Sequence, residues 1–356
     1  MPTVQGLYNI TSGVGFTSSE LNSLPGPYRV DKLAKSGVRL QPVPPLQLKS
    51  LKKIRDVVEH RSGMSIDVPL RALVRSPAAD ALLCVLEQHA VLPAKLRKRR
   101  LPPYRRMRLA TISCWWAEEI QAGSTARIQE IRSIAKELDR IYVFSQNQVD
   151  IFAEIGIQSD RVLPVDFGVD HDFFTPAPTS TRRFQVLSVG IDRGRDYQSL
   201  VDAARLLPAV EFQIFTQAGR FSPDDLPRNV TVNSPVSLEE HRENLRSAKL
   251  VVIPTHDLAY PTGQSVLLEA SACARPVLIT DTEPMREYVI DGETGLFMPL
   301  HDAEGVASSI SSALADEVRL NRIGKAARRS VESKFNFDSM WETIADDLRG
   351  LTTSKL

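Results

Sequence analysis

The chain has few cysteines, and their spacing argues against two kinds of structural site. Cys84, Cys114 and Cys273 lie far apart and form no closely spaced pair of the kind that binds a metal ion. Their odd number does not suit a disulfide framework, because each disulfide takes two cysteines. Free thiols are typical of a reducing compartment, so we expect a cytoplasmic protein.

Long hydrophobic runs and a large net charge are also missing. No stretch approaches the roughly 20 apolar residues of a membrane-spanning helix, and the N-terminus lacks the basic and apolar regions of a secretory signal. The formal net charge of +1 argues against binding of nucleic acid through bulk charge. The chain does have 356 residues, 42% hydrophobic and 24% charged, which predicts two globular domains.

The second half alternates apolar, strand-like segments with helix-like ones. This alternation predicts a parallel sheet covered by helices on both faces. Ligands then bind beyond the carboxyl ends of the strands. Ser237 and Glu240 form a capping box that marks one helix start. The expected strands are 184–190, 210–216, 249–255, 276–280 and 295–299, and the expected helices are 197–207, 237–248, 263–273, 284–290, 302–315, 317–334 and 338–351.

The first half repeats the pattern less regularly, and a Pro/Thr/Ser stretch near 171–183 is the predicted linker. We therefore predict an α/β protein with two doubly wound, Rossmann-like parallel-sheet domains facing a cleft. The domains are residues 1–172 and 173–336, and a last helix at 337–356 is a candidate to cross back to the first domain. The expected strands are 3–9, 80–87, 108–116, 140–145 and one from 160, and the expected helices are 125–139 and 147–156. Residues 10–24 are expected to be a glycine-containing loop that opens a helix.

The segment "GQSVLLEA" (263–270) is a candidate anion site. Gly263, Gln264 and Ser265 open a helix, and the first N–H groups of a helix have no partner within it. These groups and the helix dipole suit a diphosphate. Glu269 follows about a turn and a half later, where its carboxylate is able to accept hydrogen bonds from a ribose. The alternative is an ordinary helix cap with a solvated glutamate.

The loop "VGIDRGRDY" (189–197) follows a predicted strand and is a second candidate. Gly190 and Gly194 permit a tight turn, and Arg193 and Arg195 supply fixed cations. Arginine suits phosphate because its planar fork donates two parallel hydrogen bonds. A simple turn is the alternative. The strand order favours the phosphate role, because it places this loop beside the helix start at 263.

Residues 186–334 resemble the nucleotide-sugar-binding domain of GT-B-fold glycosyltransferases, in particular glycosyltransferase family four. The resemblance rests on "VLSVGIDRGRDYQSLVDAARLL", "AKLVVIPTHD" and "GQSVLLEASACARPVLITDTEPMREYVIDGETGLFMPLHD". The segment "FGVDHDFFTP" (167–176) is similar to the family's interdomain linker. The first half resembles the family only in its layout.

This resemblance implies a role for each matching residue. Glu269 matches the glutamate that holds the nucleotide ribose, and Arg195 stands at the position of a diphosphate-binding lysine. Arg193 replaces or assists the family's usual arginine, and the backbone of Ser265 and Val266 matches the part that meets the diphosphate. The implied reaction is a retaining sugar transfer in which the diphosphate acts as base.

Two departures from the family pattern put that activity in question. Pro261 stands eight residues before Glu269, where the family has another glutamate. The histidine that often follows a strand of the first domain is missing from "LATISCWWAEE" (109–119). Glu118 and His89 remain as candidate catalytic groups in this domain, although a lone histidine is more often structural.

The run "KLRKRRLPPYRRMR" (95–108) holds eight basic residues. Most such runs are solvated helix ends and loops. The functional alternative is contact with an anionic surface, either lipid headgroups at the inner membrane face or a phosphate-bearing acceptor. Nucleic acid is the weaker option, because Tyr104 is the only aromatic residue in the run.

These observations together predict a cytoplasmic glycosyltransferase. Its donor would be a nucleoside-diphosphate sugar, and its acceptor a glycan, a lipid-linked molecule or a small molecule. We expect no cofactor and no metal ion, because no Asp-x-Asp cluster is present and arginines already supply positive charge. The alternatives are a non-catalytic scaffold of the same fold and a nucleotide-sugar epimerase.

Overall fold

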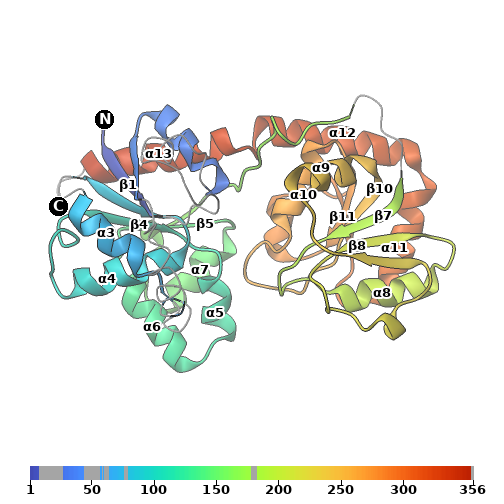
Figure 1. Ribbon diagram of the computed structural model, residues 1–356, viewed down its shortest axis with the longest axis horizontal. Helices are drawn as coiled ribbons and strands as arrows, with labels where there is room; N and C mark the ends of the chain where they lie inside the picture. Colours follow the sequence, from blue (N-terminus) through green and yellow to red (C-terminus); the bar gives the residue numbers. More distant parts are fainter. Residues whose placement is uncertain are drawn as a thin grey trace. The chain divides into compact units, whose positions relative to one another are not determined.

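The computed structural model describes residues 1–7, 27–43, 57, 59, 64–75, 79–177 and 183–353. They form two compact units, unit 1 (Met1–Asp166 and Phe337–Leu356) and unit 2 (Phe167–Asn336) (Figure 1). The chain passes from unit 1 to unit 2 shortly before the predicted linker, and the last helix lies in unit 1. The loop and helix start predicted at 10–24 lie outside the described residues.

Unit 2 is built on a six-stranded sheet in which all strand pairs are parallel. The order reverses between its two central strands, so the loops that follow them diverge at a switch point where parallel sheets bind ligands. The strands, in spatial order, are β12 (Leu296–Met298), β11 (Val277–Thr280), β10 (Ala248–Ile253), β7 (Phe184–Val189), β8 (Phe212–Phe215) and β9 (Val230–Asn233).

Helices cover both faces of this sheet (Figure 1). On one face α8 (Tyr197–Leu206) packs against α11 (Ala303–Ala315). On the other face α10 (Gln264–Ala272) packs against α9 (Leu238–Ser247) and α12 (Glu317–Ser333). Val186, Leu250 and Val252 are fully buried in a hydrophobic cluster with side chains of α8 and α11. Burial of such a side chain contributes about 1.5–3 kcal/mol.

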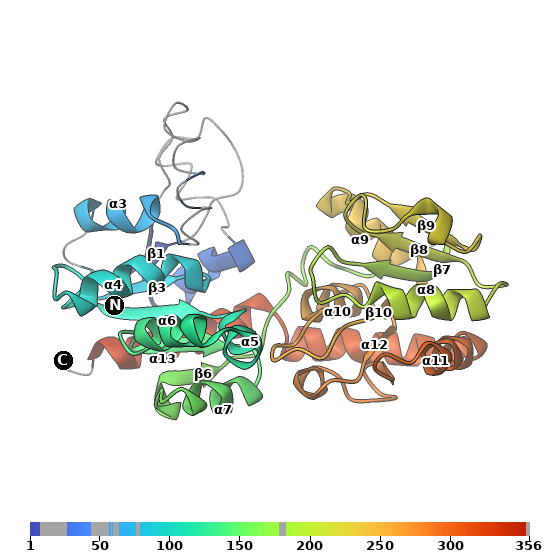
Figure 2. The same cartoon turned by 90° about the horizontal axis from the view of Figure 1, so that it is seen from below.

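Unit 1 holds a second parallel six-stranded sheet. Helix α4 (Val91–Lys98) lies beside α6 (Thr125–Ala135), which contacts α5 (Trp116–Ala122) (Figure 2). The last helix, α13 (Phe337–Thr353), packs on η1 (Pro27–Ser36). The strands in spatial order are β2 (Arg39–Pro42), β1 (Thr3–Leu7), β3 (Ala81–Cys84), β4 (Arg108–Ile112), β5 (Arg140–Val143) and β6 (Val162–Pro164), and the helices are η1 (Pro27–Ser36), α3 (Asp67–Arg75), η2 (Glu87–His89), α4 (Val91–Lys98), α5 (Trp116–Ala122), α6 (Thr125–Ala135), α7 (Asn147–Glu154), η3 (Ser159–Arg161) and α13 (Phe337–Thr353).

The prediction of two α/β domains with parallel sheets is confirmed, and two local predictions are wrong. The strand predicted at 108–116 ends at Ile112, because the N–H groups of Cys114 and Trp115 bond to the Glu87 carboxylate and not to a neighbouring strand. The helix predicted at 284–290 is a short 3-10 helix, η5 (Glu283–Glu287). Within the described residues, no helix has the length and apolar character to cross a bilayer.

Candidate functional site

A cavity of about 460 Å³ lies at the carboxyl edge of the unit 2 sheet. Its walls come from the loop after β7, the end of β8, the segment between β9 and α9, and the first turns of α9 and α10. This is the switch-point edge, where parallel sheets bind ligands. The lining residues are Val189, Gly190, Ile191, Asp192, Arg195, Phe215, Pro235, Val236, Leu238, His241, Ser265, Val266 and Glu269.

Arg195 is buried in the wall of this cavity, with 2% of its surface exposed. Its Nε donates to the carbonyl oxygen of Val189 at 3.3 Å, and Nη1 lies 3.6 Å from a carboxylate oxygen of Asp192. Nη1 is buried and has no hydrogen-bond partner in the described part of the chain. An unsatisfied buried donor costs about 1–3 kcal/mol, more when it is charged, so this group is suited to a strong incoming acceptor.

Two glycines make room for the Arg195 guanidinium. A Cβ at Gly190 would collide with Nε, and a Cβ at Gly263 would lie 2.8 Å from Nη1. Gly263 also takes the left-handed conformation, with φ of 89°, as the N-cap of α10. The loop after β7 and the start of α10 therefore approach each other closely because neither glycine carries a side chain.

The start of α10 has features that suit an anion site. Ser265 and Val266 line the cavity, and Ser265 is exposed. N–H groups at this position of a helix have no partner within it, and the helix dipole adds positive potential. Gln264 begins the helix beside the cavity lining, and its Oε1 is buried with no partner among the described residues.

Glu269 is paired with His241 across the cavity wall. Nε2 of His241 lies 2.9 Å from Oε2 of Glu269, and the two side chains are 13% and 20% exposed. The pair joins α9 to α10 and engages only one of the two carboxylate oxygens. The sequence does not single out His241. The available signal is that this histidine lies in the first turns of a predicted helix that ends up beside the candidate anion site.

Arg193 does not belong to the residues that line the cavity. It is exposed, although it lies two residues from Arg195 in the same loop. The loop conformation turns only one of the two arginines inward. A direct contact of Arg193 with a diphosphate stays a prediction.

His89 and Glu118 lie in unit 1, whereas the cavity lies in unit 2. Glu118 is half-buried on α5. Glu87, which the sequence does not flag, is buried and accepts hydrogen bonds from the N–H groups of Cys114 at 3.2 Å and Trp115 at 2.6 Å. Burial raises the pKa of Glu87. Catalytic roles for His89 and Glu118 stay predictions.

His89 is 1% exposed, and its Nδ1 has no partner among the described residues. Burial lowers the pKa of His89 to about 4, whereas an unfolded histidine titrates near pH 6.5. Between these values the unfolded chain binds a proton that the folded chain does not, so stability falls as pH falls through this window. The full difference amounts to about 3 kcal/mol.

We therefore expect His89→Gln to lose about 2–3 kcal/mol less stability than the wild type between pH 7 and pH 4. Urea unfolding followed by tryptophan fluorescence measures this, because all three tryptophans lie in unit 1. His171→Gln, in unit 2, is the control. Identical pH profiles for His89→Gln and the wild type would show that burial does not keep His89 neutral.

The basic run 95–108 is divided between ion pairs and solvent. Arg97 and Arg108 both pair with Asp139, and Lys95 lies 3.3 Å from Glu130. The exposed arginines of the run are Arg99, Arg100, Arg105 and Arg106. Contact with an anionic membrane stays a prediction for these four arginines and for Lys98, which is exposed and donates to the Ser133 hydroxyl at 2.8 Å. Sedimentation with anionic liposomes would test it.

One cluster of potential metal ligands lies within the described residues of unit 2. Asp196, His256 and His301 each place a ligand atom within 4.8 Å of the others. None of the three lines the cavity. The sequence predicts no metal for sugar transfer, and this cluster contributes no side chain to the walls of the predicted donor site.

Comparison with solved structures identifies the fold as GT-B, the fold of a large class of glycosyltransferases. A sucrose-phosphate synthase from Thermosynechococcus elongatus aligns with a TM-score of 0.73 at 15% identity, over 99% of both chains. HepE of Anabaena, solved with UDP and glucose, aligns with a TM-score of 0.71 at 14% identity, over 98% of this chain and 100% of HepE. The predicted fold class is thereby confirmed.

The sequence comparisons cover a smaller part of the chain. Residues 224–330 match the family model described as "Glycosyl transferases group 1". A D-inositol 3-phosphate glycosyltransferase of Xylanimonas cellulosilytica is 26% identical over 260 residues, 64% of this chain and 58% of the relative. Another, from an Arthrobacter species, is 31% identical over 185 residues, 45% of this chain and 43% of the relative. The chain spans about half the length of the curated relatives it matches.

Proposed function

We propose that this protein is a glycosyltransferase that moves a sugar from a nucleoside-diphosphate sugar to an acceptor. The observation that carries the proposal is the buried Nη1 of Arg195, which has no hydrogen-bond partner among the described residues and lies beside the start of α10 at the unit 2 cavity. A diphosphate satisfies both features at once, because it offers charged oxygens to a guanidinium and to helix N–H groups.

The rest of the cavity fits the remaining parts of such a donor. The free oxygen of the Glu269 carboxylate is available to a ribose hydroxyl, and His241 holds the other oxygen. Phe215, Val236 and Leu238 provide apolar wall for a base. Ligand sites commonly combine an apolar lining with a few such polar groups.

In the transfer we propose, the bond between the anomeric carbon and the diphosphate oxygen breaks, and the acceptor hydroxyl forms the new bond on the same face. The acceptor proton goes to the leaving diphosphate. Arg195 and the α10 start stabilise the charge that builds on that group, so no metal is needed at this step. Retention and the base role of the diphosphate rest on the family resemblance.

Pro261 is the residue that agrees least with this proposal, because it stands where the family that this chain resembles has a glutamate. It is buried, and its carbonyl oxygen accepts the N–H of Gln264 at 3.3 Å. We propose that Gln264 takes over the missing glutamate's contact with the donor sugar, because its buried Oε1 has no partner among the described residues. Thr262 is the weaker candidate, because its hydroxyl already donates to the Tyr260 carbonyl oxygen at 3.3 Å.

Calorimetric unfolding with added UDP, ADP, GDP and their glucose conjugates tests the proposal. One nucleoside diphosphate should raise the unfolding temperature of unit 2, since ligand at 100 times its Kd stabilises by about 2.7 kcal/mol. Glu269→Gln should weaken that ligand about 10-fold or more, because hydrogen bonds to a charged group contribute about 1.5–3 kcal/mol. Calorimetry is preferred because the tryptophans report only on unit 1.

The matched control is Glu317→Gln, an exposed glutamate on α12, which should bind as the wild type does. If no nucleotide raises the unfolding temperature, the proposed donor site is wrong. If a nucleotide sugar binds but is neither hydrolysed nor transferred, the protein is a scaffold that retained the donor site. Conversion of the sugar without release of the diphosphate would indicate an epimerase.

A further inference from the structure

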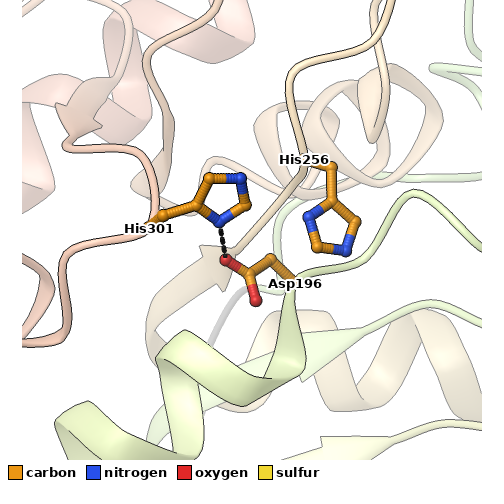
Figure 3. Close-up of side chains that lie close together, drawn as sticks. All are labelled: Asp196, His256 and His301. Atoms are coloured by element: carbon orange, nitrogen blue, oxygen red, sulfur yellow. Dashed lines mark hydrogen bonds and ion pairs between the residues drawn. The ribbon is translucent and has the colours of Figure 1, made fainter.

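Asp196, His256 and His301 come from three different loops at the carboxyl edge of the unit 2 sheet (Figure 3). Figure 3 shows their side chains converging, with Nδ1 of His301 2.8 Å from Oδ2 of Asp196. The two imidazole rings lie with their centroids 5.2 Å apart. A carboxylate and two imidazoles thus share a space small enough for one ion.

The backbone fixes the first two members of this cluster. The N–H of Asp196 donates to the carbonyl oxygen of Pro254 at 3.1 Å, and the N–H of His256 donates to the carbonyl oxygen of Gly194 at 2.9 Å. These two bonds tie the loop after β7 to the loop after β10. Asp196 also caps α8, where its carboxylate accepts the N–H and the hydroxyl of Ser199 at 3.2 and 2.6 Å.

His301 is held in a backbone conformation that is uncommon for residues other than glycine. Its φ is 52°, in the left-handed region, just before Asp302 caps α11. A residue other than glycine costs about 1–2 kcal/mol there. Such residues persist where the surrounding structure fixes them, and they cluster at functional sites. A glycine at this position would adopt the same backbone conformation without this cost. The imidazole is what His301 provides and a glycine would not.

We propose that Asp196, His256 and His301 bind one zinc ion. Zinc takes imidazole nitrogen and carboxylate oxygen at about 2.0–2.2 Å, with four ligands in a tetrahedron, which sets the ligand atoms about 3.4 Å apart. The ligand atoms of the cluster lie within 4.8 Å of one another, so they would have to move closer together to hold the ion. Two imidazoles favour zinc over magnesium or calcium, which prefer oxygen ligands. Ser199 orients the carboxylate, as outer partners of metal ligands commonly do.

Solvent would reach the bound ion, and the ion would make one wall of the cavity more rigid. The side chain of His301 is 53% exposed, so the fourth position is open to water. The ion would cross-link the loops after β7, β10 and β12. Because Arg195 immediately precedes Asp196, this cross-link would also make the cavity wall that carries the Arg195 guanidinium more rigid. The zinc site itself does not depend on the proposed sugar transfer.

Zinc binding to the full-length, chelator-treated protein tests the proposal, measured by competition with a chromophoric chelator at pH 7.5. One equivalent of Zn²⁺ should bind per chain, and excess Mg²⁺ should not displace it. His256→Ala and His301→Gly should each weaken zinc by about 100-fold or more, because even outer partners are worth about 10–100-fold. His301→Gly removes a ligand and relieves the left-handed strain, so this variant should fold at least as well as the wild type.

His171→Gln is the control, because His171 lies in unit 2 outside the cluster. Zinc should raise the unfolding temperature of the wild type and of this control but not of His301→Gly. The proposal is overturned if no saturable one-to-one binding appears. It is also overturned if the two cluster variants and His171→Gln bind zinc equally, which would mean an adventitious ion only.

Discussion

Arg195→Ala should lower the affinity for the nucleoside diphosphate by roughly 100-fold or more, while Arg193→Ala changes it by less than about twofold. Loss of a buried charged partner from a hydrogen-bonded pair costs about 2–5 kcal/mol, whereas an exposed ion pair is worth about 0–1 kcal/mol. The two arginines lie in one loop and carry the same charge. Their comparison therefore separates the buried contact from the general field of the loop.

Isothermal titration calorimetry with the nucleotide that stabilises the wild type measures both variants. Arg195→Lys keeps the charge but loses the fork and the bond from Nε to Val189, so it should recover only part of the affinity. Unfolding without ligand checks that each variant is folded. A folded Arg195→Ala with wild-type affinity, or an equal loss in Arg193→Ala, would contradict the proposed diphosphate contact.

The sequence predicts the buried strands of both sheets and misses two strands at sheet edges. β2 (Arg39–Pro42) and β9 (Val230–Asn233) are both edge strands, and most of their residues are partly or fully exposed. A central parallel strand is covered on both faces and reads as an apolar run, whereas an edge strand needs no such run. An edge position therefore permits a strand without an apolar run but does not require one, because the edge strands β6 and β12 do carry apolar residues and are predicted.

The candidate site shows the same limit at the level of side chains. Glu269 and the α10 start are predictable because a local pattern, a glycine turn followed by an apolar helix, defines them. The choice between Arg193 and Arg195 is not predictable, because it depends on how one short loop folds. His241 reaches Glu269 only through the packing of α9 on α10, which no local pattern encodes.

Asp196, His256 and His301 are hidden from the sequence for a related reason. They belong to three loops that the parallel sheet gathers at one edge, and no two of them have the short spacing of a metal motif. Strand order brings them together, and the hydrogen bonds between the loops after β7 and β10 set two of the three positions. A prediction of no metal made from motifs alone does not address clusters of this kind.

Gly263→Ala should be the second most damaging change, because it acts on the backbone and on Arg195 together. Its φ of 89° is unfavourable for alanine by about 1–2 kcal/mol. The new Cβ would also lie 2.7 Å from Cγ2 of Ile253 and 2.8 Å from Nη1 of Arg195. Atoms this close must move apart, so either the start of α10 shifts or the Arg195 guanidinium is displaced from its position in the cavity wall.

Gly292→Ala is the matched control, because Gly292 has φ of 71° in the same unit and a Cβ there would meet its nearest neighbour, Arg319, at an ordinary 3.6 Å. Both variants should lose about 1–2 kcal/mol of stability to backbone strain. Only Gly263→Ala should lose further stability and bind the nucleotide at least about 10-fold more weakly, since a displaced ligand group forfeits about 1.4 kcal/mol or more. Calorimetric unfolding and nucleotide titration measure the two effects separately. If Gly263→Ala binds nucleotide as tightly as Gly292→Ala, the close approach of α10 to Arg195 has no part in ligand binding.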